Sequence, residues 1–512
     1  MSNKFELPDN LKTATIEQWH SLVERALNGS TIDEKLTFKT YDDIQIKPLY
    51  TKADEVQQSA PIQRQKSTAS ATETTSRPWK ILQLIDVPAL KAANEQISTD
   101  INGGASGLVL AISNDIPYAS AELPLYNMAD YQTLFANSNI TGKSLYFTNG
   151  REGLVNAANF ISYATAGGLD LSTIDGSFGF DPLSLFASQG HYPEPEDEAF
   201  DNWLDAAAAI EATGCKMTPF LASGRTWQQA GASEAMELGF TLAALLSYVR
   251  ALEKSGMTTA EAFKKVDISL TTSSDIFLST AKLRAMRLLW SKVYSASLPE
   301  QAQDKDHQPK LIAEMSYLGL TRADPEVNML RATVATVAAG LGNADALVLL
   351  PFSAAHGVAS KAARRLALNT QIIAQEESHI GKVEDPARGS WYVENLTSQL
   401  AEKAWTVFQK TESSGGLTGM LKSGAIKTMI DEKRETQTND ISQGNKQITG
   451  VTIFPNINET PPELFEDEDD SWQEVEASSS NVVPTLKAPI VSGGDAGARF
   501  KDIQEVLGKG TP

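Results

Sequence analysis

The turn SGRTWQQ (223–229) follows one predicted strand at a point where a barrel enzyme would carry catalytic groups. It comes after the apolar run MTPFL and before the helical pattern LGFTLAALLSYVRAL. In barrel enzymes the active site is built from residues that follow the carboxyl ends of the strands. Proton transfer at neutral pH uses a histidine or a carboxyl group with a shifted pKa. Ser223 to Gln228 include no acid, histidine or cysteine, so this turn supplies no proton-transferring group.

The ends of the other predicted strands offer few such groups. Asp175, in IDGSFGF, fits a catalytic carboxylate and a turn residue equally well, because Asp and Gly after a strand are also turn signals. His356 lies four residues beyond the eighth predicted strand, and we interpret it as a histidine at the start of a helix, although it could reach a site there. The remaining polar candidates are Asp86, Ser113, Asn114, Thr148, Ser223 to Thr226, Thr271 to Asp275, Ser316 and Pro351 to Ser353.

The other chemistry-bearing residues favour structural roles. The single cysteine, Cys215, rules out an internal disulfide, and we interpret it as a small buried residue. His379 has carboxylates beside it, but one histidine among scattered acids is not a metal site. The glycine-rich INGGASG (101–107) precedes a strand, whereas a phosphate-binding loop follows one. The sequence also has no G-x-x-x-x-G-K-[ST], H-E-x-x-H or G-x-S-x-G, and no G-x-G-x-x-G after a strand.

Eight short apolar runs predict the strands that would position these groups. All but one are followed by a clear helical pattern; the runs are 79–86, 107–113, 144–148, 169–175, 217–223, 266–272, 310–316 and 344–352. Alternating units of this number predict an α/β protein with a closed (β/α)8 TIM barrel. A doubly wound open sheet is the alternative, but the even spacing favours closure. The eighth run, ALVLLPF, has no polar side chain on either face, which is typical of a barrel filled by side chains.

Composition divides the chain into five regions. The barrel occupies 78–385 and is followed by a C-terminal helical extension over 386–438. Residues 51–77, rich in Ser, Thr, Gln and Ala, predict a linker, and the polar, acidic residues 439–512 predict a disordered tail. Residues 1–50 predict an N-terminal helical arm whose apolar residues share one helical face: Ile16, Trp19, Leu22, Val23 and Leu27.

The charge balance excludes some classes of partner. The net charge is −20, of which −8 lies between Glu463 and Glu476, and this argues against nucleic acid and anionic membranes. No run of about 18 apolar residues predicts a membrane span. The start, MSNKFELPDNLKTATIEQW, lacks the pattern of a secretory signal. With one cysteine, these features predict a cytoplasmic protein.

Five longer stretches carry a family resemblance. In order they are RPWKILQ, QQAGASEAMELGFTLAALLSYVRAL, DIFLSTAKLRAMRLLWSKV, TRADPEVNMLRATVATVAAGLGNADAL and NTQIIAQEESHIGKVEDPARGSWYVENLT. Their residues and the order in which they occur resemble those of the adenosylcobalamin-dependent acyl-CoA mutases, above all the methylmalonyl-CoA mutase family. The resemblance extends from about Arg77 to Lys410, and it implies the same closed barrel.

The chain departs from that family where active members carry catalytic groups. In the resemblance, Thr226 stands where active chains have a histidine after the fifth strand, in a pattern like G-Y-H-M-Q-E-A-G-A. Val348 stands in the place of a second histidine, near the end of the eighth strand. A substrate-facing tyrosine motif, Y-x-T-M, is missing ahead of Arg77. The resemblance therefore implies that this chain has no catalytic residues of its own.

The sequence also lacks the motif of the family's cobalamin-binding domain. Members that hold the cofactor carry a flavodoxin-like domain with D-x-H-x-x-G, and no such motif occurs here. The resemblance thus implies that adenosylcobalamin is bound by another chain, and that this chain binds neither cofactor nor metal.

The family offers a role for such a chain. It resembles the small, or beta, non-catalytic subunit of heterodimeric methylmalonyl-CoA mutases, which implies a catalytic large (alpha) partner that isomerises methylmalonyl-CoA and succinyl-CoA. By that analogy Trp19, Leu22 and Leu27 of the arm pack on the large subunit. The alternative is the catalytic barrel half of a split mutase with a separate cobalamin-binding subunit. An unrelated barrel lyase is a third interpretation, which the five ordered stretches disfavour.

Overall fold

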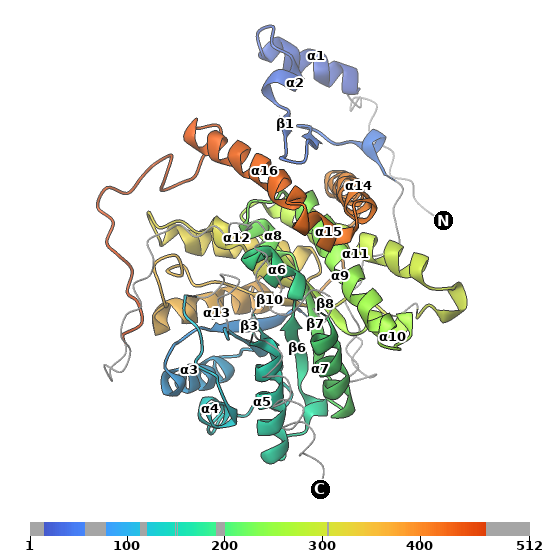
Figure 1. Ribbon diagram of the computed structural model, residues 1–512. Coiled ribbons are helices and arrows are strands. Elements are labelled where there is room, and N and C mark those ends of the chain that lie inside the picture. The colour runs from blue at the N-terminus through green and yellow to red at the C-terminus, as the bar shows by residue number, and fades with distance from the viewer. Residues whose placement is uncertain are drawn as a thin grey trace, which may run out of the picture.

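A closed barrel of eight parallel strands forms the centre of the computed structural model, which describes residues 15–56, 78–112, 120–148, 150, 152–190, 200–304 and 307–466 (Figure 1). The strands are β3 (Lys80–Ile85), β4 (Gly107–Leu110), β5 (Ser144–Phe147), β6 (Asp175–Phe180), β7 (Thr218–Ser223), β8 (Val266–Thr272), β9 (Leu311–Met315) and β10 (Ala346–Val348). Each strand pairs with the next in the chain, and β10 closes the ring by pairing with both β9 and β3. The predicted (β/α)8 barrel is confirmed, and the open-sheet alternative is wrong.

The fourth barrel strand lies later in the chain than predicted. Residues 169–175 form a short 3-10 helix, η2 (Leu171–Thr173), and the strand begins only at Asp175. Two glycines made the true strand, DGSFGF, resemble a loop. Gly176 adopts φ +126° because β6 approaches β5 so closely that an added Cβ would collide with the Leu145 carbonyl. The close approach of two backbones therefore requires Gly176, one of the two glycines that concealed this strand.

Helices surround the barrel in the order that the alternating pattern predicts. They are α3 (Leu90–Asn102), α4 (Met128–Leu134), α5 (Gly153–Ala166), α6 (Pro182–Gln189), α7 (Asp201–Ala212), α8 (Arg225–Gln229), α9 (Glu234–Lys254), α10 (Thr259–Phe263), α11 (Ile276–Ser297), α12 (Val327–Leu341) and α13 (Lys361–Glu376), with 3-10 turns η3 (Glu300–Ala302) and η4 (Tyr317–Gly319). Among the described helices α9 alone is long and apolar enough to span a bilayer, and 78% of its most apolar window is buried in the protein. Its apolarity is that of a core helix packed between the barrel and other helices.

The C-terminal extension packs on the outside of this helical layer. It comprises α14 (Trp391–Ser413), α15 (Gly416–Lys422) and α16 (Ala425–Ser442), and α14 lies along α9 and α11. The predicted boundary at 438/439 falls inside α16. Residues 443–466 then return to the barrel, where the Phe465 N–H donates to the Val358 carbonyl at 2.9 Å. The rest of the predicted tail, 467–512, lies outside the described residues.

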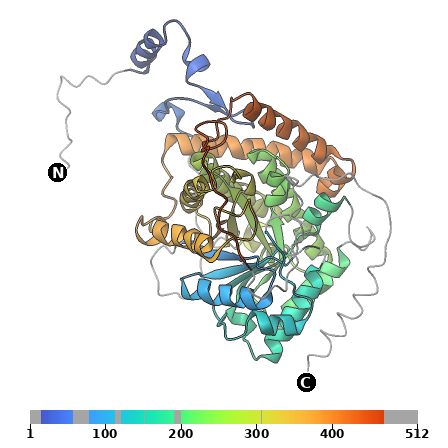
Figure 2. The ribbon, with the colours of Figure 1, turned by 90° about the vertical axis from the view of Figure 1, so that its left-hand side faces the viewer.

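The N-terminal arm has a docked part and a projecting part (Figures 1 and 2). It consists of α1 (Ile16–Ala26), α2 (Ile32–Lys35), a small hairpin of β1 (Phe38–Lys39) and β2 (Gln45–Ile46), and the 3-10 turn η1 (Lys52–Asp54). A capping box of Thr15 and Gln18 starts α1, yet none of the α1 residues is buried. Residues 57–77 of the predicted linker lie outside the described residues.

Candidate functional site

A small cavity lies on the barrel axis, where a barrel enzyme would bind its substrate. It encloses about 30 Å³. A water molecule needs at least about 10–15 Å³ of such space, and pockets for small ligands reach several hundred. Its lining residues come from six of the eight strands and the turns after them: Val109, Tyr146, Phe147, Thr148, Gly179, Asp181, Leu221, Ser223, Arg225, Ile312, Glu314 and Val348. The cavity therefore has room for one or two water molecules.

A buried ion pair forms part of the lining of this cavity. Arg225, the first residue of α8, places Nη1 2.5 Å from Oε2 of Glu314 on β9. Their side chains are only 6% and 5% exposed. Two charges can be buried in a protein interior when they neutralise each other at hydrogen-bond distance. The pair thus links the end of β7 to β9, across the intervening strand β8.

The two residues in the family's histidine positions face different surroundings. Val348 ends β10 and lines the cavity with an aliphatic side chain. Thr226 lies in α8, is fully buried, and is not among the residues that line the cavity. Its hydroxyl has no hydrogen-bond partner among the described residues. Neither side chain can exchange a proton at neutral pH.

Asp175 was placed at the wrong end of the barrel by the sequence interpretation. It begins β6, so it lies at the amino-terminal face, where it contacts Lys80 and Ser144. Burial opposes its ionisation, but Lys80 and Lys310 outweigh burial and hold the pKa of Asp175 below its ordinary value. Asp175 is therefore a structural carboxylate at the face opposite the expected active site.

The other two aspartates lie at carboxyl ends of strands, as predicted. Asp86 follows β3, is buried, and accepts a hydrogen bond from the Ser120 N–H at 3.1 Å. Burial raises its pKa. Asp275 is the N-cap of α11 and accepts from the Leu278 N–H at 3.0 Å. Ser113 and Asn114 lie outside the described residues.

Asp181 is a carboxylate at the barrel mouth that the sequence analysis missed. It follows β6, lines the cavity and is 5% exposed. It accepts hydrogen bonds from the N–H groups of Ser184 and Ser223, both at 3.1 Å, and from the Tyr248 hydroxyl. Burial raises its pKa. The signal was the pair Asp181-Pro182, a helix cap followed by proline at the first helical position, hidden by the misplaced strand.

Asp181 anchors the wall of the barrel, and its removal should cost stability. Asp181→Ala leaves three buried donors without their acceptor, so we expect the free energy of unfolding to fall by about 1–3 kcal/mol. Urea denaturation followed by tryptophan fluorescence measures the change. Asp170→Ala, which removes the exposed cap of η2, should have a smaller effect.

None of the described histidines lies at the cavity. His356 bonds the Arg322 carbonyl at 2.8 Å through Nε2, and His379 occupies a left-handed turn after α13 with φ +57°. His307 packs against Trp290 and Tyr294, and burial lowers its pKa to about 4. Cys215 is half-buried, and burial raises the pKa of its thiol.

The described part of the chain contains no group of three His, Cys, Asp or Glu side chains able to hold a metal. The cavity is also too small for an acyl-CoA thioester or a corrin ring, and no lining residue is a histidine that could ligate cobalt. The residues at the barrel axis therefore do not fit the cofactor or substrate of an acyl-CoA mutase.

Known proteins nevertheless resemble this chain over most of its length. The family model for methylmalonyl-CoA mutase matches residues 39–487. The methylmalonyl-CoA mutase small subunit of Streptomyces virginiae is 33% identical over 473 residues, covering 90% of this chain and 72% of the relative. The small subunit of Propionibacterium freudenreichii subsp. shermanii is 29% identical over 467 residues, covering 88% and 70%. The methylmalonyl-CoA mutase of Cereibacter sphaeroides is 30% identical over 478 residues, covering 89% of this chain and 66% of the relative.

Proposed function

The chain belongs to the methylmalonyl-CoA mutase family, and we propose that it is the non-catalytic small subunit of a heterodimeric mutase. The complex would isomerise (R)-methylmalonyl-CoA and succinyl-CoA, a reaction of propionate metabolism, in the cytoplasm. The family is typically cobalamin-dependent. In this proposal adenosylcobalamin is bound by the catalytic large chain, where it supplies radical chemistry, and this chain binds none.

The closed barrel axis is the observation that carries the proposal. The paired Arg225 and Glu314 and the aliphatic Val348 line the cavity in the barrel, whose volume is only about 30 Å³. An acyl-CoA substrate needs an open and polar path to the reacting centre. The alternative, a catalytic barrel half served by a separate cobalamin protein, needs that path in this chain.

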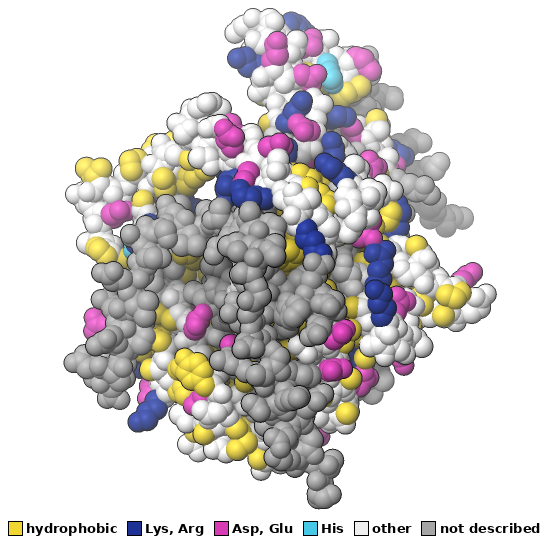
Figure 3. Space-filling view, in the orientation of Figure 1, with side chains coloured by type: hydrophobic (Ala, Val, Ile, Leu, Met, Phe, Trp, Pro, Cys, Tyr) yellow, Lys and Arg dark blue, Asp and Glu magenta, His cyan; other side chains and the backbone are white. Residues whose placement is uncertain are grey.

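The exposed apolar face of the projecting helix α1 supports the proposal that the chain has a protein partner. It is amphipathic, and its apolar face includes Ile16 and Leu22, which are 40% and 58% exposed. In the space-filling view the arm stands clear of the body and carries hydrophobic surface beside charged side chains (Figure 3). An 11-residue helix is marginal in water without tertiary packing, so a pre-capped apolar face of this kind favours a protein partner. Two relatives named small subunits suggest that the partner is a large subunit.

The isolated chain should not bind the substrate. We expect isothermal titration calorimetry to show no saturable binding of methylmalonyl-CoA up to ~1 mM, the weak end of common substrate affinities. When it is co-expressed with a full-length large chain, we expect this chain to form a one-to-one complex. That complex should bind methylmalonyl-CoA through the large chain.

Reconstitution separates this proposal from the split-enzyme alternative. A stable complex whose activity depends only on the large chain's cobalamin supports a structural subunit. If the chain binds methylmalonyl-CoA alone and turns it over with an isolated cobalamin-binding protein, the structural role is wrong.

A further inference from the structure

A short loop after α16, residues 450–459, carries the two most exposed large apolar side chains in the described part of the chain. Phe454 is 82% exposed and Ile457 is 89% exposed. Together with Val451, which is 40% exposed, they give this one loop three exposed apolar side chains. Single exposed apolar residues are common on protein surfaces, whereas several that lie together mark a binding surface.

Both ends of the loop are fixed at the same point of the body. Gly450 lies so close to Asp324 that an added Cβ would be 2.8 Å from the Asp324 Cβ. At the other end of the loop, the Asp324 N–H donates to the Glu459 carboxylate. Arg331 on α12 donates to the Thr449 carbonyl at 2.6 Å, just before the loop. The loop therefore leaves the body and returns to it at Asp324, and compact surface loops with close ends are frequently functional.

Hydrogen bonds inside the loop fix its backbone. The Gly450 N–H donates to the Ile453 carbonyl at 2.8 Å, and the Asn456 side chain accepts from the Asn458 N–H at 3.1 Å. Between them Phe454 has φ +50°, a left-handed conformation that is rare for a bulky residue. Backbone strain of this kind persists where neighbouring contacts maintain it, and it is concentrated at functional sites. The loop thus presents Phe454 to the solvent in a fixed conformation.

The charges around the loop favour one kind of partner. Glu459 ends the loop, Glu463 and Glu466 follow it, and the interval from Glu463 to Glu476 has a net charge of −8. Two copies of this chain that met through the loop would bring like charges together, and so would an anionic membrane. The complementary surface is a protein with an apolar pocket that is surrounded by lysine and arginine side chains.

We propose that the 450–459 loop is a second contact for the catalytic large chain, with Phe454 and Ile457 inserted into an apolar pocket that has a basic rim. The inference rests on the proposed function, because it takes the large chain as the partner. It adds a surface from the opposite end of the described chain to that of α1. The segment after α16, which includes the loop, runs along the outside of the body (Figure 2).

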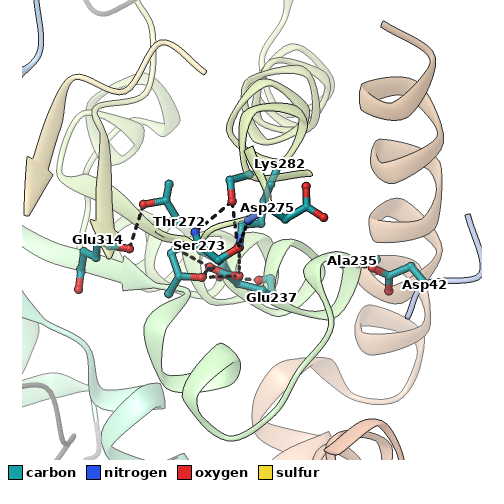
Figure 4. A network of polar contacts seen from close by, with 11 residues as sticks. Asp42, Ala235, Glu237, Thr272, Ser273, Asp275, Lys282 and Glu314 are labelled. Carbon is teal, nitrogen blue, oxygen red and sulfur yellow. Dashed lines mark hydrogen bonds and ion pairs between the residues drawn. The ribbon is translucent and has the colours of Figure 1, made fainter. Parts of the chain in front are cut away.

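The arm that carries α1 is also fixed on the body. Asp42, in its hairpin, is 8% exposed and accepts hydrogen bonds at the start of α9, from the Ser233 hydroxyl at 2.5 Å and the Ala235 N–H at 3.0 Å (Figure 4). Lys433 on α16 donates to the Tyr41 carbonyl at 2.7 Å. Two contacts on one body bind a common partner more tightly than either alone, because the second contact forms within the complex. Loss of the loop contact should therefore weaken assembly without abolishing it.

Removal of the apolar side chains tests the loop. In the full chain, Phe454→Ser, Ile457→Ser should lower the affinity for a purified large chain about tenfold, as measured by analytical ultracentrifugation. The matched control Tyr126→Ser, Val383→Ser removes two side chains that are 78% and 64% exposed elsewhere, and it should leave the affinity unchanged. Urea denaturation of the isolated chain should show the same stability for both variants, because all four side chains are exposed.

A photo-crosslink identifies the pocket directly. We expect p-benzoylphenylalanine in place of Phe454 to cross-link to a peptide of the large chain that is flanked by lysine or arginine, whereas the same group in place of Tyr126 should not. If the unaltered chain forms no complex with the large chain, the proposed function itself is wrong. If the unaltered chain assembles but the loop variant assembles equally well, or the cross-link goes to a second copy of this chain, only the loop contact is wrong.

Discussion

Replacing Arg225 with methionine should lower the free energy of unfolding by about 3–5 kcal/mol, because it leaves the Glu314 carboxylate buried in the barrel without a cation. Urea denaturation followed by tryptophan fluorescence measures this loss. The double variant Arg225→Met, Glu314→Leu removes both charges and should recover most of the stability. Apolar side chains of similar volume often replace a buried ion pair without loss.

A surface pair provides the control for this experiment. Arg250 and Glu412 form an ion pair in which Arg250 is 53% exposed, so Arg250→Met should cost under about 1 kcal/mol. If Arg225→Met is as mild as Arg250→Met, the barrel axis admits water to Glu314. The axis would then be open, and the closed-axis argument for a non-catalytic chain would fail.

Loss of the apolar face of α1 should abolish assembly with the large chain. The double variant Trp19→Asp, Leu22→Asp places two charges on that face, and we expect the affinity for a co-purified large chain to fall at least about a hundredfold. The stability of the isolated chain should not change, since none of the α1 residues is buried. Analytical ultracentrifugation measures the affinity for the large chain, and urea denaturation measures the stability of the isolated chain.

Ser21→Asp adds a charge to the opposite side of the same helix and should leave assembly intact. If the double variant assembles normally, the partner contacts another surface and α1 has no role in the interface. If Ser21→Asp is equally damaging, the effect comes from helix stability or net charge rather than from the apolar face.

The barrel could be predicted because most of its strands are buried on both faces. Strand-length runs such as those at β7 and β8 therefore marked strands at nearly the observed bounds. β6 was misplaced because close backbone contact with β5 requires Gly176, and glycine is otherwise a turn signal. That error moved Asp175 to the wrong face of the barrel and concealed Asp181 at the mouth.

The details of the site depend on contacts between distant parts of the chain. A single sequence does not indicate that Arg225 meets Glu314, 89 residues later, or that Asp42 caps a helix that begins at Glu234. The sequence does indicate which catalytic side chains of the family are missing from this chain. Thr226 and Val348 were identified from a family pattern, and the structure places only Val348 on the cavity.

The projecting helix has a consequence for how fast a partner is found. Because α1 stands clear of the body, a diffusing partner meets it over a wider range of distances and orientations than it meets the barrel surface (Figures 1 and 2). The capping box favours the helical form before the encounter, which reduces the conformational entropy lost at first contact. Association would then proceed in two steps, capture by α1 followed by closure of the bodies. In such a scheme the association rate constant depends on the arm, and the lifetime of the complex depends on the larger surface that closes afterwards.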